Sequence, residues 1–505
     1  MSLLVFAVFG ALFVLVAVVI ARAFPVGDPE DFLVAGRSLP FGIISASVMI
    51  SWIWTTTLLG AAEAGYLFGI GGGFAFAIGS VVPFFVFIPL ALRLRRLMPY
   101  GTTFLEFVRE RYGVGLQRGL LVLTILLALY ISGEQIIGIS YALSASYQIP
   151  YAAVAMISTL IVVLYLTIAG LRGSVLNDVI QFFVIAIVVF VLLPVVATNI
   201  GIGNIYEGLA QVAGNPDNEL YNPDALTLLA PAAIRYCLIA LVISMGFVLL
   251  NQGYYSKARA AISSKSLLAA YLLGTVIAWA PVPILFGVVL GGGGLAQGMT
   301  TGEELRVTTD VASAVFTQAL PTGGALAFSL MVFMAGMTTA GNALAGFQAL
   351  VTVDLRRSLP AGRWLLSSPT RFARLSTLVF GVVVAIFAIV LQGASLLYID
   401  ILSGIIFSTP IAALVLGLLW RRPSTPVAAV SIVLGLLGGI GTYLAVDDPN
   451  LDYFYGNVVS LGLPFLVVVV GTVLSKRDYD FDELKEYRSP TAEARSGPDP
   501  DAEGL

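Results

Sequence analysis

Histidine is absent from this chain of 505 residues, and cysteine occurs once, as Cys237. Without histidine the chain lacks the commonest metal ligand and the usual general base, and one cysteine excludes an intrachain disulfide or a cysteine-based metal site. Charged residues are also scarce, at 11%, and the net charge of −3 says little about partners. These absences argue against an enzyme, and nothing in the composition points to nucleic acid.

Hydrophobic residues make up 58% of the chain, and the mean hydropathy is +0.96. Apolar runs of about 20 residues recur along it, which is the length that a helix needs to cross a bilayer. A membrane β-barrel would show shorter, alternating segments. The first run, 3–20, has no basic region before it and no small-residue cleavage site after it, so we expect a retained helix. The sequence therefore predicts an all-α polytopic membrane protein.

The distribution of Lys and Arg orients the expected helices, because short cytoplasmic loops carry an excess of these residues. With the N-terminus outside, all but two of the 26 Lys and Arg residues fall on the cytoplasmic side, and the exceptions are Arg235 and Arg306. The C-terminus is then cytoplasmic. The thirteen predicted transmembrane helices are 2–22, 41–69, 71–92, 119–145, 151–170, 178–200, 232–254, 267–291, 323–352, 375–396, 399–420, 425–446 and 456–474.

Two of these spans have the features of interrupted helices. Span 41–69 is too long for one straight crossing and carries SWIWTTTLLGAAEAG, and span 232–254 contains ISMGF and runs into NQGYY. Five spans separate their starts. Interruptions at matching places in two five-helix groups are typical of transporters built from inverted repeats, with a binding site at the membrane midplane. The alternative is that the glycines only allow close helix packing.

Four segments resemble, in order and spacing, parts of the sodium:solute symporter family. They are DFLVAGRSLP (31–40), YLTIAGLRGSVLNDVIQ (165–181), NQGYYSKARAAISSKS (251–266) and LGLLWRRPSTPVA (416–428). The resemblance implies a leucine-transporter-type fold, a five-plus-five inverted repeat with one helix before it and two after. The expected parts are a first helix with its following cytoplasmic segment (1–40), a core (41–420, with repeats 41–200 and 232–420), two additional helices (421–475) and a disordered cytoplasmic tail (476–505).

Within this family, SWIWTTTLLGAAEAGYLFGI and TTFLEFVRERYG most resemble the urea-symporter branch. The segment GLRGS departs from the family pattern, with Ala169 in the place of a glycine. Thr57 and Phe76 stand where related sugar carriers have Gln and Glu, which argues against a sugar. The resemblance leaves the solute open between a urea-like compound, an amino acid and a carboxylate.

Residues 333–346, FMAGMTTAGNALAG, place polar side chains in an apolar span. Ala335, Thr338, Thr339 and Asn342 have the spacing of one helix face. Hydroxyl and carbonyl oxygens suit a hard cation without burying a carboxylate. The alternative is that the threonines hydrogen-bond to carbonyls of their own helix.

The resemblance assigns this threonine pair to the sodium-binding hydroxyls of the family. Further ligands would be carbonyl oxygens freed where span 41–69 unwinds. By alignment on Gly60 and Gly69, the expected sodium ligands are Ile50, Ile53, Ala335, Thr338 and Thr339.

Asp178, Glu134 and Glu63 are candidate functional acids within predicted spans. Asp178 either caps the sixth span with Gln181 or attracts sodium leaving its site, since the family has an acid here. Glu134 lies mid-span, where an acid is functional by default, as a proton-coupled group or a solute hydrogen-bond partner; a protonated structural acid is the alternative. Glu63 either pairs with Arg235 as an outer gate or reaches water.

Solute contacts are expected from the unwound segments and their neighbours. The candidates are Trp54, Thr56, Thr57, Glu134, Ser244 and Phe247. The sequence thus predicts a sodium-coupled secondary symporter in the plasma membrane, with a small solute, sodium and the lipid bilayer as its partners and no cofactor. A non-transporting sensor and a solute channel of the same architecture are the alternatives. The short tail argues against a sensor, and a channel would not need a site that closes on both sides.

Overall fold

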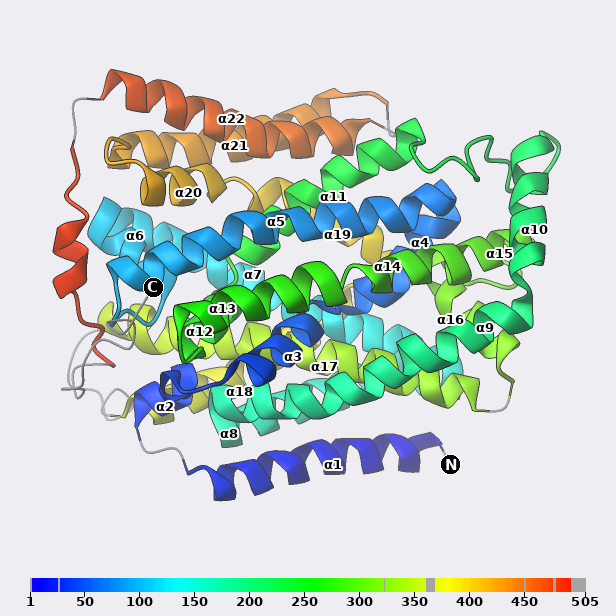
Figure 1. The fold of residues 1–505 in the computed structure, drawn as a ribbon, viewed down its shortest axis with the longest axis horizontal. Coiled ribbons are helices and arrows are strands. Elements are labelled where there is room, and N and C mark those ends of the chain that lie inside the picture. The colour runs from blue at the N-terminus through cyan, green and yellow to red at the C-terminus, as the bar shows by residue number, and fades with distance from the viewer. Residues whose placement is uncertain are drawn as a thin grey trace.

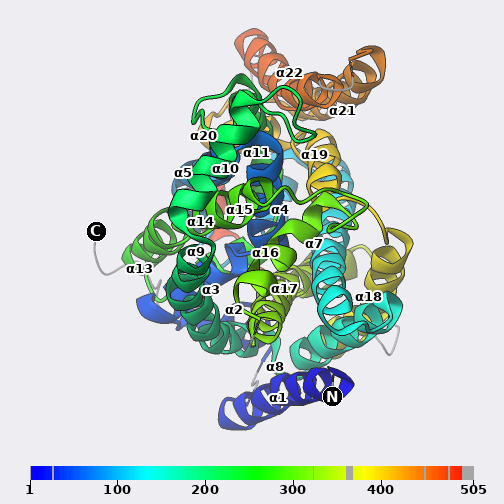
Figure 2. The same ribbon diagram turned by 90° about the vertical axis from the view of Figure 1, so that its right-hand side faces the viewer.

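The computed structural model describes residues 2–25, 28–321, 323–359, 368–448, 451–475 and 478–491. These residues form helices and no β-strand. Most helices run along the long axis of the molecule in Figure 1. Helix α1 lies at one margin of the bundle, and α21 and α22 lie at the opposite margin in both ribbon views (Figures 1 and 2).

The α-helices are α1 (Ser2–Ala23), α2 (Pro29–Val34), α3 (Phe41–Trp52), α4 (Thr55–Phe68), α5 (Ile70–Leu97), α6 (Phe104–Tyr112), α7 (Val114–Tyr147), α8 (Tyr151–Ile187), α9 (Leu193–Ile200), α10 (Ile202–Gly214), α11 (Pro231–Leu249), α12 (Gln252–Ala260), α13 (Ser264–Tyr271), α14 (Pro281–Leu285), α15 (Gly292–Ala296), α16 (Val311–Ala319), α17 (Gly324–Leu350), α18 (Pro369–Val390), α19 (Leu396–Phe407), α20 (Ile411–Leu419), α21 (Thr425–Ala445) and α22 (Asp452–Leu474). Short π-helical or 3-10 segments are η1 (Ala35–Arg37), η2 (Val188–Leu192), η3 (Leu272–Ala278), η4 (Phe286–Gly291), η5 (Thr308–Asp310), η6 (Val351–Leu355) and η8 (Asp482–Glu486).

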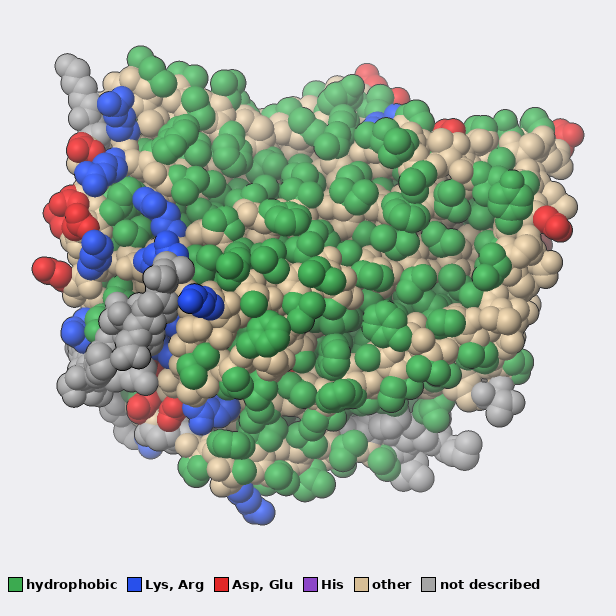
Figure 3. Space-filling model, in the orientation of Figure 1, with side chains coloured by type: hydrophobic (Ala, Val, Ile, Leu, Met, Phe, Trp, Pro, Cys, Tyr) green, Lys and Arg blue, Asp and Glu red, His purple; other side chains and the backbone are tan. Residues whose placement is uncertain are grey.

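The surface of the bundle has the composition of a membrane protein. Among the described residues, nine helical stretches are long and apolar enough to cross a bilayer, and the number rises to eleven if each of two bent helix pairs is one crossing. Figure 3 shows apolar side chains across the flank of the molecule, while Lys and Arg gather at its left end. In Figure 1 that end carries α2, α6 and α12. The charges therefore lie outside an apolar belt.

The expected break in span 41–69 is present, because α3 and α4 meet at a bend of 48°. In span 232–254, α11 is regular through ISMGF and ends at Leu249, so the interruption lies where the span runs into NQGYY. Asn251 starts α12 by accepting a hydrogen bond from the Gly253 N–H at 2.9 Å, as an N-cap does. A further bend of 50° separates α19 from α20, and the sequence did not predict it.

The longest apolar stretch, Tyr151–Ile200, covers 50 residues. A straight helix of that length would measure about 75 Å, more than twice the hydrocarbon thickness of about 30 Å. Gly170 interrupts it with φ 59° and ψ −156°. A Cβ atom at Gly170 would lie 2.6 Å from the Phe32 ring and 2.8 Å from its carbonyl oxygen, so only glycine fits this change of direction.

The predicted disordered tail, 476–505, is partly ordered. Residues 478–491 contain η8 and pack against the bundle. The Tyr487 hydroxyl donates to Glu106 at 2.9 Å and accepts from Arg357 at 2.7 Å. The expectation of disorder is therefore wrong for 478–491, because aromatic side chains there find partners on the helix ends. The other residues of the predicted tail lie outside the described residues.

Candidate functional site

The break between α3 and α4 exposes peptide groups inside the bundle. Ile53 has φ −82° and ψ 86°, and Trp54 is extended, so neither continues the helix. The Trp52 carbonyl, freed by this break, accepts a hydrogen bond from the Trp279 indole at 2.6 Å. Side chains of other helices thus satisfy backbone groups that would otherwise be unpaired in the membrane.

Two glycines allow neighbouring helices to approach the break. A Cβ atom at Gly138 on α7 would lie 2.4 Å from the Thr55 side chain, and one at Gly336 on α17 would lie 3.1 Å from it. The close approach lets the Gln135 amide oxygen on α7 accept from the Thr55 N–H at 2.8 Å. Helices α7 and α17 therefore both contact the start of α4.

Some of the residues that the sequence assigned to sodium lie close to one another at this break. The Thr339 hydroxyl lies 3.4 Å from the Ile53 carbonyl oxygen and 3.3 Å from the Ser51 carbonyl oxygen. The Ile50 carbonyl accepts from the Ile53 N–H at 3.1 Å, which places it at the last turn of α3. The Thr339 hydroxyl on α17 therefore lies beside two carbonyl oxygens at the end of α3, those of Ser51 and Ile53.

The other two expected ligands lie on the same helix as Thr339. Thr338 donates to the carbonyl of Met334 at 3.0 Å, which is the own-helix hydrogen bond of the alternative interpretation. Ala335 is fully buried one turn before Thr339. In this arrangement the Thr339 hydroxyl faces the break, whereas the Thr338 hydroxyl is bonded to its own helix.

Asp178 does not cap a helix, since it lies inside α8, and the capping interpretation is wrong. Its expected partner Gln181 is buried with no hydrogen-bond partner for its side chain. Instead, the Asp178 carboxylate accepts from the Ser47 hydroxyl at 2.6 Å and from the Lys257 ammonium at 3.0 Å. Lys257 also donates to the Ser51 hydroxyl. The acid therefore ties α8 to α3 and α12 next to the break.

Lys257 is fully buried, which the sequence did not indicate. In the sequence it is one of several cytoplasmic positive charges, in a stretch without apolar periodicity. Its burial follows from meeting Asp178, because a charge inside a protein needs an opposite charge and hydrogen-bond partners.

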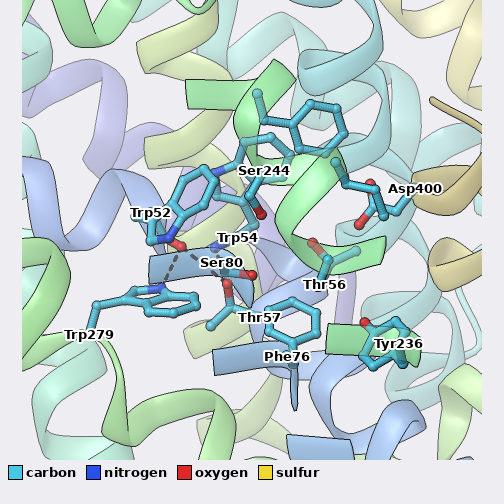
Figure 4. A pocket seen from close by; sticks show the side chains of 13 residues that line it. Trp52, Trp54, Thr56, Thr57, Phe76, Ser80, Tyr236, Ser244, Trp279 and Asp400 are labelled. Carbon is cyan, nitrogen blue, oxygen red and sulfur yellow. Dashed lines mark hydrogen bonds between the residues drawn. The ribbon is translucent and has the colours of Figure 1, made fainter. Parts of the chain in front are cut away.

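A cavity of about 30 Å³ adjoins the break (Figure 4). Five of the six expected solute contacts line it, and Glu134 is the exception. The Trp54 and Phe247 rings stack with centroids 4.9 Å apart. Figure 4 shows the tryptophans on one side of the cavity and Thr56 and Asp400 on the other. The lining residues are Trp52, Trp54, Thr56, Thr57, Phe76, Ser80, Tyr236, Ala240, Ile243, Ser244, Phe247, Trp279 and Asp400.

Asp400, on α19, is a site residue that the sequence analysis missed. It lies in the apolar run LLYIDILSGIIF, so the argument that singled out Glu134 would have found it. Its carboxylate accepts from the Tyr130 hydroxyl at 2.7 Å. Glu134 is fully buried behind the lining, and the Thr56 side chain faces both acids.

Glu63 follows neither expectation. It is 1% exposed, so it does not reach water, and it is absent from the ion pairs of the described residues, as is Arg235. Its carboxylate accepts from Thr308, from Thr309 at 2.9 Å and from Ser395 at 3.1 Å. Both expectations are therefore wrong, and Glu63 holds η5 and the start of α19 against α4.

Comparison with known proteins places these features in a family. The sequence pattern of the Sodium:solute symporter family matches residues 32–435. The urea active transporter of Saccharomyces cerevisiae is 28% identical over 90% of this chain, which spans 66% of the yeast protein. The urea-proton symporter of Oryza sativa is 27% identical over 90% of the chain and 68% of its own length.

Among solved structures, a Na⁺-coupled sialic acid symporter in a substrate-bound outward-open state superimposes with a TM-score of 0.76. The match covers 94% of this chain and 98% of that protein at 16% identity. At this identity the match establishes the shared fold and says nothing about the solute.

Proposed function

Because the chain belongs to the sodium:solute symporter family, we propose that it is a sodium-coupled symporter that takes up urea or a similarly small, uncharged amide. The family and the relatives named above are transporters, so the chain is a transporter and not an enzyme. The proposed mechanism is alternating access, with no covalent step and no cofactor besides the coupling ion.

The position of Thr339 at the α3–α4 break carries the proposal for sodium. Its hydroxyl lies 3.4 Å from the Ile53 carbonyl, and Ile53 lies between the cavity-lining residues Trp52 and Trp54. An ion bound by Ile50, Ile53, Ala335, Thr338 and Thr339 would thus fix the backbone that shapes the solute cavity. Binding of each ligand would then favour binding of the other.

The size and lining of the cavity support a urea-like solute. About 30 Å³ is room for two to three water-sized spheres, which suits a solute of a few heavy atoms. Of the described residues that line the cavity, Asp400 alone is acidic or basic, and an acid there disfavours carboxylate solutes. The two relatives named above are described as urea transporters, and amino acids remain the second candidate class.

We also propose the thirteen-helix topology, with the N-terminus outside and the C-terminus cytoplasmic in a plasma membrane. Among the described residues, the long apolar stretches and the two bent pairs give up to eleven crossings. The break at Gly170 divides Tyr151–Ile200 into two crossings, which adds one, and α1 adds another. Lys and Arg at the end of the bundle that carries α2, α6 and α12 support that end as cytoplasmic. The proposed repeats are 41–200 and 232–420.

Uptake of labelled urea into proteoliposomes tests the proposal. We expect accumulation with an inward sodium gradient and none when choline replaces sodium on both sides. A channel would equilibrate urea without concentrating it, and a sensor would bind urea without uptake. Equal uptake with sodium and with choline would contradict sodium coupling.

A further inference from the structure

Two carboxyl groups beside the cavity have no positively charged partner. Within the described residues, Glu134 on α7 and Asp400 on α19 form no ion pair with lysine or arginine. Glu134 is 0% exposed and Asp400 is 7% exposed. An ionised carboxylate so deep in a protein is costly unless a hydrogen-bond donor or a cation compensates it.

Both groups retain capacity to accept hydrogen bonds, because a carboxylate offers about four acceptor sites. Tyr130 donates to one oxygen of Asp400 at 2.7 Å. Gln135 donates to one oxygen of Glu134 at 3.2 Å, and no described residue makes a hydrogen bond to the other oxygen of Glu134. Thr56 lines the same cavity as Asp400, and its side chain faces both acids. The free oxygen of Glu134, like the absence of a positively charged partner, therefore indicates that a hydrogen-bond donor from a solute could bind here.

The groups around the pair add negative charge or none. Glu63 on α4 and Tyr236 on α11 face Asp400, and Tyr130 on α7 faces both acids. Lys257, the buried lysine beside the break in the described part of the chain, is already paired with Asp178. This side of the cavity is thus rich in acceptors and lacks a cation.

We propose that Asp400 and Glu134 form an acceptor pole that recognises solutes by their N–H donors, and that the same site binds guanidinium more tightly than urea. The inference rests on the proposed function, since it names the solute class of that cavity. Guanidinium has the planar frame of urea, with six N–H donors in place of four and a positive charge. Charge-assisted hydrogen bonds are about twice as strong as neutral ones, so the charge favours guanidinium at an uncompensated pole.

A competitor series on the wild-type transporter tests this inference without any substitution. Unlabelled urea, guanidinium, tetramethylurea and tetramethylammonium are each added to proteoliposomes that take up labelled urea. We expect guanidinium to inhibit at a concentration at least about fivefold lower than urea does, from one stronger hydrogen bond. Tetramethylurea, without N–H donors, and tetramethylammonium, with charge alone, should not inhibit.

Asp400→Asn tests the residue assignment. The amide keeps the size of the side chain but presents an N–H where the solute needs an acceptor, so the advantage of guanidinium over urea should disappear. Asp354→Asn is the matched control, because Asp354 is also a buried carboxyl, held by Thr103 at 2.9 Å and Gln117 at 3.0 Å, but does not line the cavity. It should keep the wild-type inhibition order.

Inhibition by tetramethylurea equal to that by urea would overturn the inference, and so would a guanidinium effect that Asp400→Asn leaves unchanged. Inhibition by guanidinium weaker than by urea would also overturn it, and would indicate that a proton already neutralises the pair. If the protein takes up no urea, the proposed function fails, and a direct binding assay still decides the inference. In that assay millimolar guanidinium should raise the melting temperature of the wild type more than that of Asp400→Asn. Equal shifts in the two proteins would show that the inference fails as well.

Discussion

The substitution Thr339→Val tests the proposed sodium ligand with little disturbance of the fold. Thr339 is 1% exposed, and its hydroxyl lies 3.3 Å and 3.4 Å from the carbonyl oxygens of Ser51 and Ile53. Valine keeps the β-branched shape and removes only the oxygen. If the hydroxyl merely joins α17 to α3, its loss should lower stability by about 1 kcal/mol and leave the response to sodium unchanged.

If the hydroxyl binds sodium, the loss is larger and specific. A hydrogen-bond-like contact to a charged group contributes about 1.5–3 kcal/mol, which is about 10- to 100-fold in a dissociation constant. The assay is the sodium concentration that gives half-maximal urea uptake, together with the sodium-induced shift in melting temperature. The half-maximal sodium concentration for uptake should rise at least about tenfold, and at least about tenfold more sodium should be needed for the same melting-temperature shift. Thr339→Ser restores an oxygen and should recover most of the affinity.

Thr377→Val is the matched control, since Thr377 is fully buried on α18 and donates to the Ala373 carbonyl at 2.8 Å. It should leave the sodium dependence unchanged. Thr338→Val should also weaken sodium binding by about tenfold or more if the ion draws its hydroxyl from Met334. Wild-type sodium dependence in Thr339→Val would refute the ligand assignment and show that the ion binds elsewhere.

Three further predictions concern the buried ion pair, the contact between α7 and α4, and the membrane topology. Lys257→Met and Asp178→Asn should each lower the melting temperature, because removing one partner of a buried ion pair costs about 3–5 kcal/mol; the double variant should recover part of the loss. Gly138→Val should abolish urea uptake, because its Cβ has no room beside α4. A reporter fused at Asn218 should be extracellular and one at Arg357 cytoplasmic.

Each of these predictions has a contrary result. Gly115→Val on the same helix is the control, because no described atom lies within 4 Å of a Cβ added there, and it should retain uptake. An equal loss of uptake in both variants would show that the loss in Gly138→Val does not come from the contact with α4. An unchanged melting temperature in Lys257→Met would show that its buried pair contributes nothing. Both reporters on one side of the membrane would break the thirteen-helix topology.

The sequence predicted those features of the site that follow from local patterns. The length of span 41–69 indicated that it is broken, and the resemblance to the family pointed to Ile53 at the break. The helical spacing of the small and polar residues indicated the face of α17 that carries Thr339. Asp400 carries the same signal as Glu134, an acid in an apolar span, and could have been predicted in the same way.

The contacts that the sequence did not predict join distant segments. Lys257 is buried because it meets Asp178, 79 residues earlier, and Glu63 is buried because Thr308 meets it from 245 residues away. Such pairs depend on how helices pack, and no periodicity records them. The order of segment 478–491 also depends on distant contacts. Its polar composition favours disorder, but its aromatic side chains pack against other parts of the chain, as Phe481 does with Arg93, 5.1 Å from the ring centroid.

The measurement that tests the central claim most directly is the mutual dependence of sodium and urea binding at equilibrium. Sodium affinity is measured on purified protein with and without urea, and urea affinity with and without sodium. If both ligands bind at the α3–α4 break, each should raise the affinity of the other by the same factor, as linkage requires. Thr339→Val should weaken the binding of sodium and remove its effect on urea. Sodium and urea affinities that do not depend on each other would contradict the account.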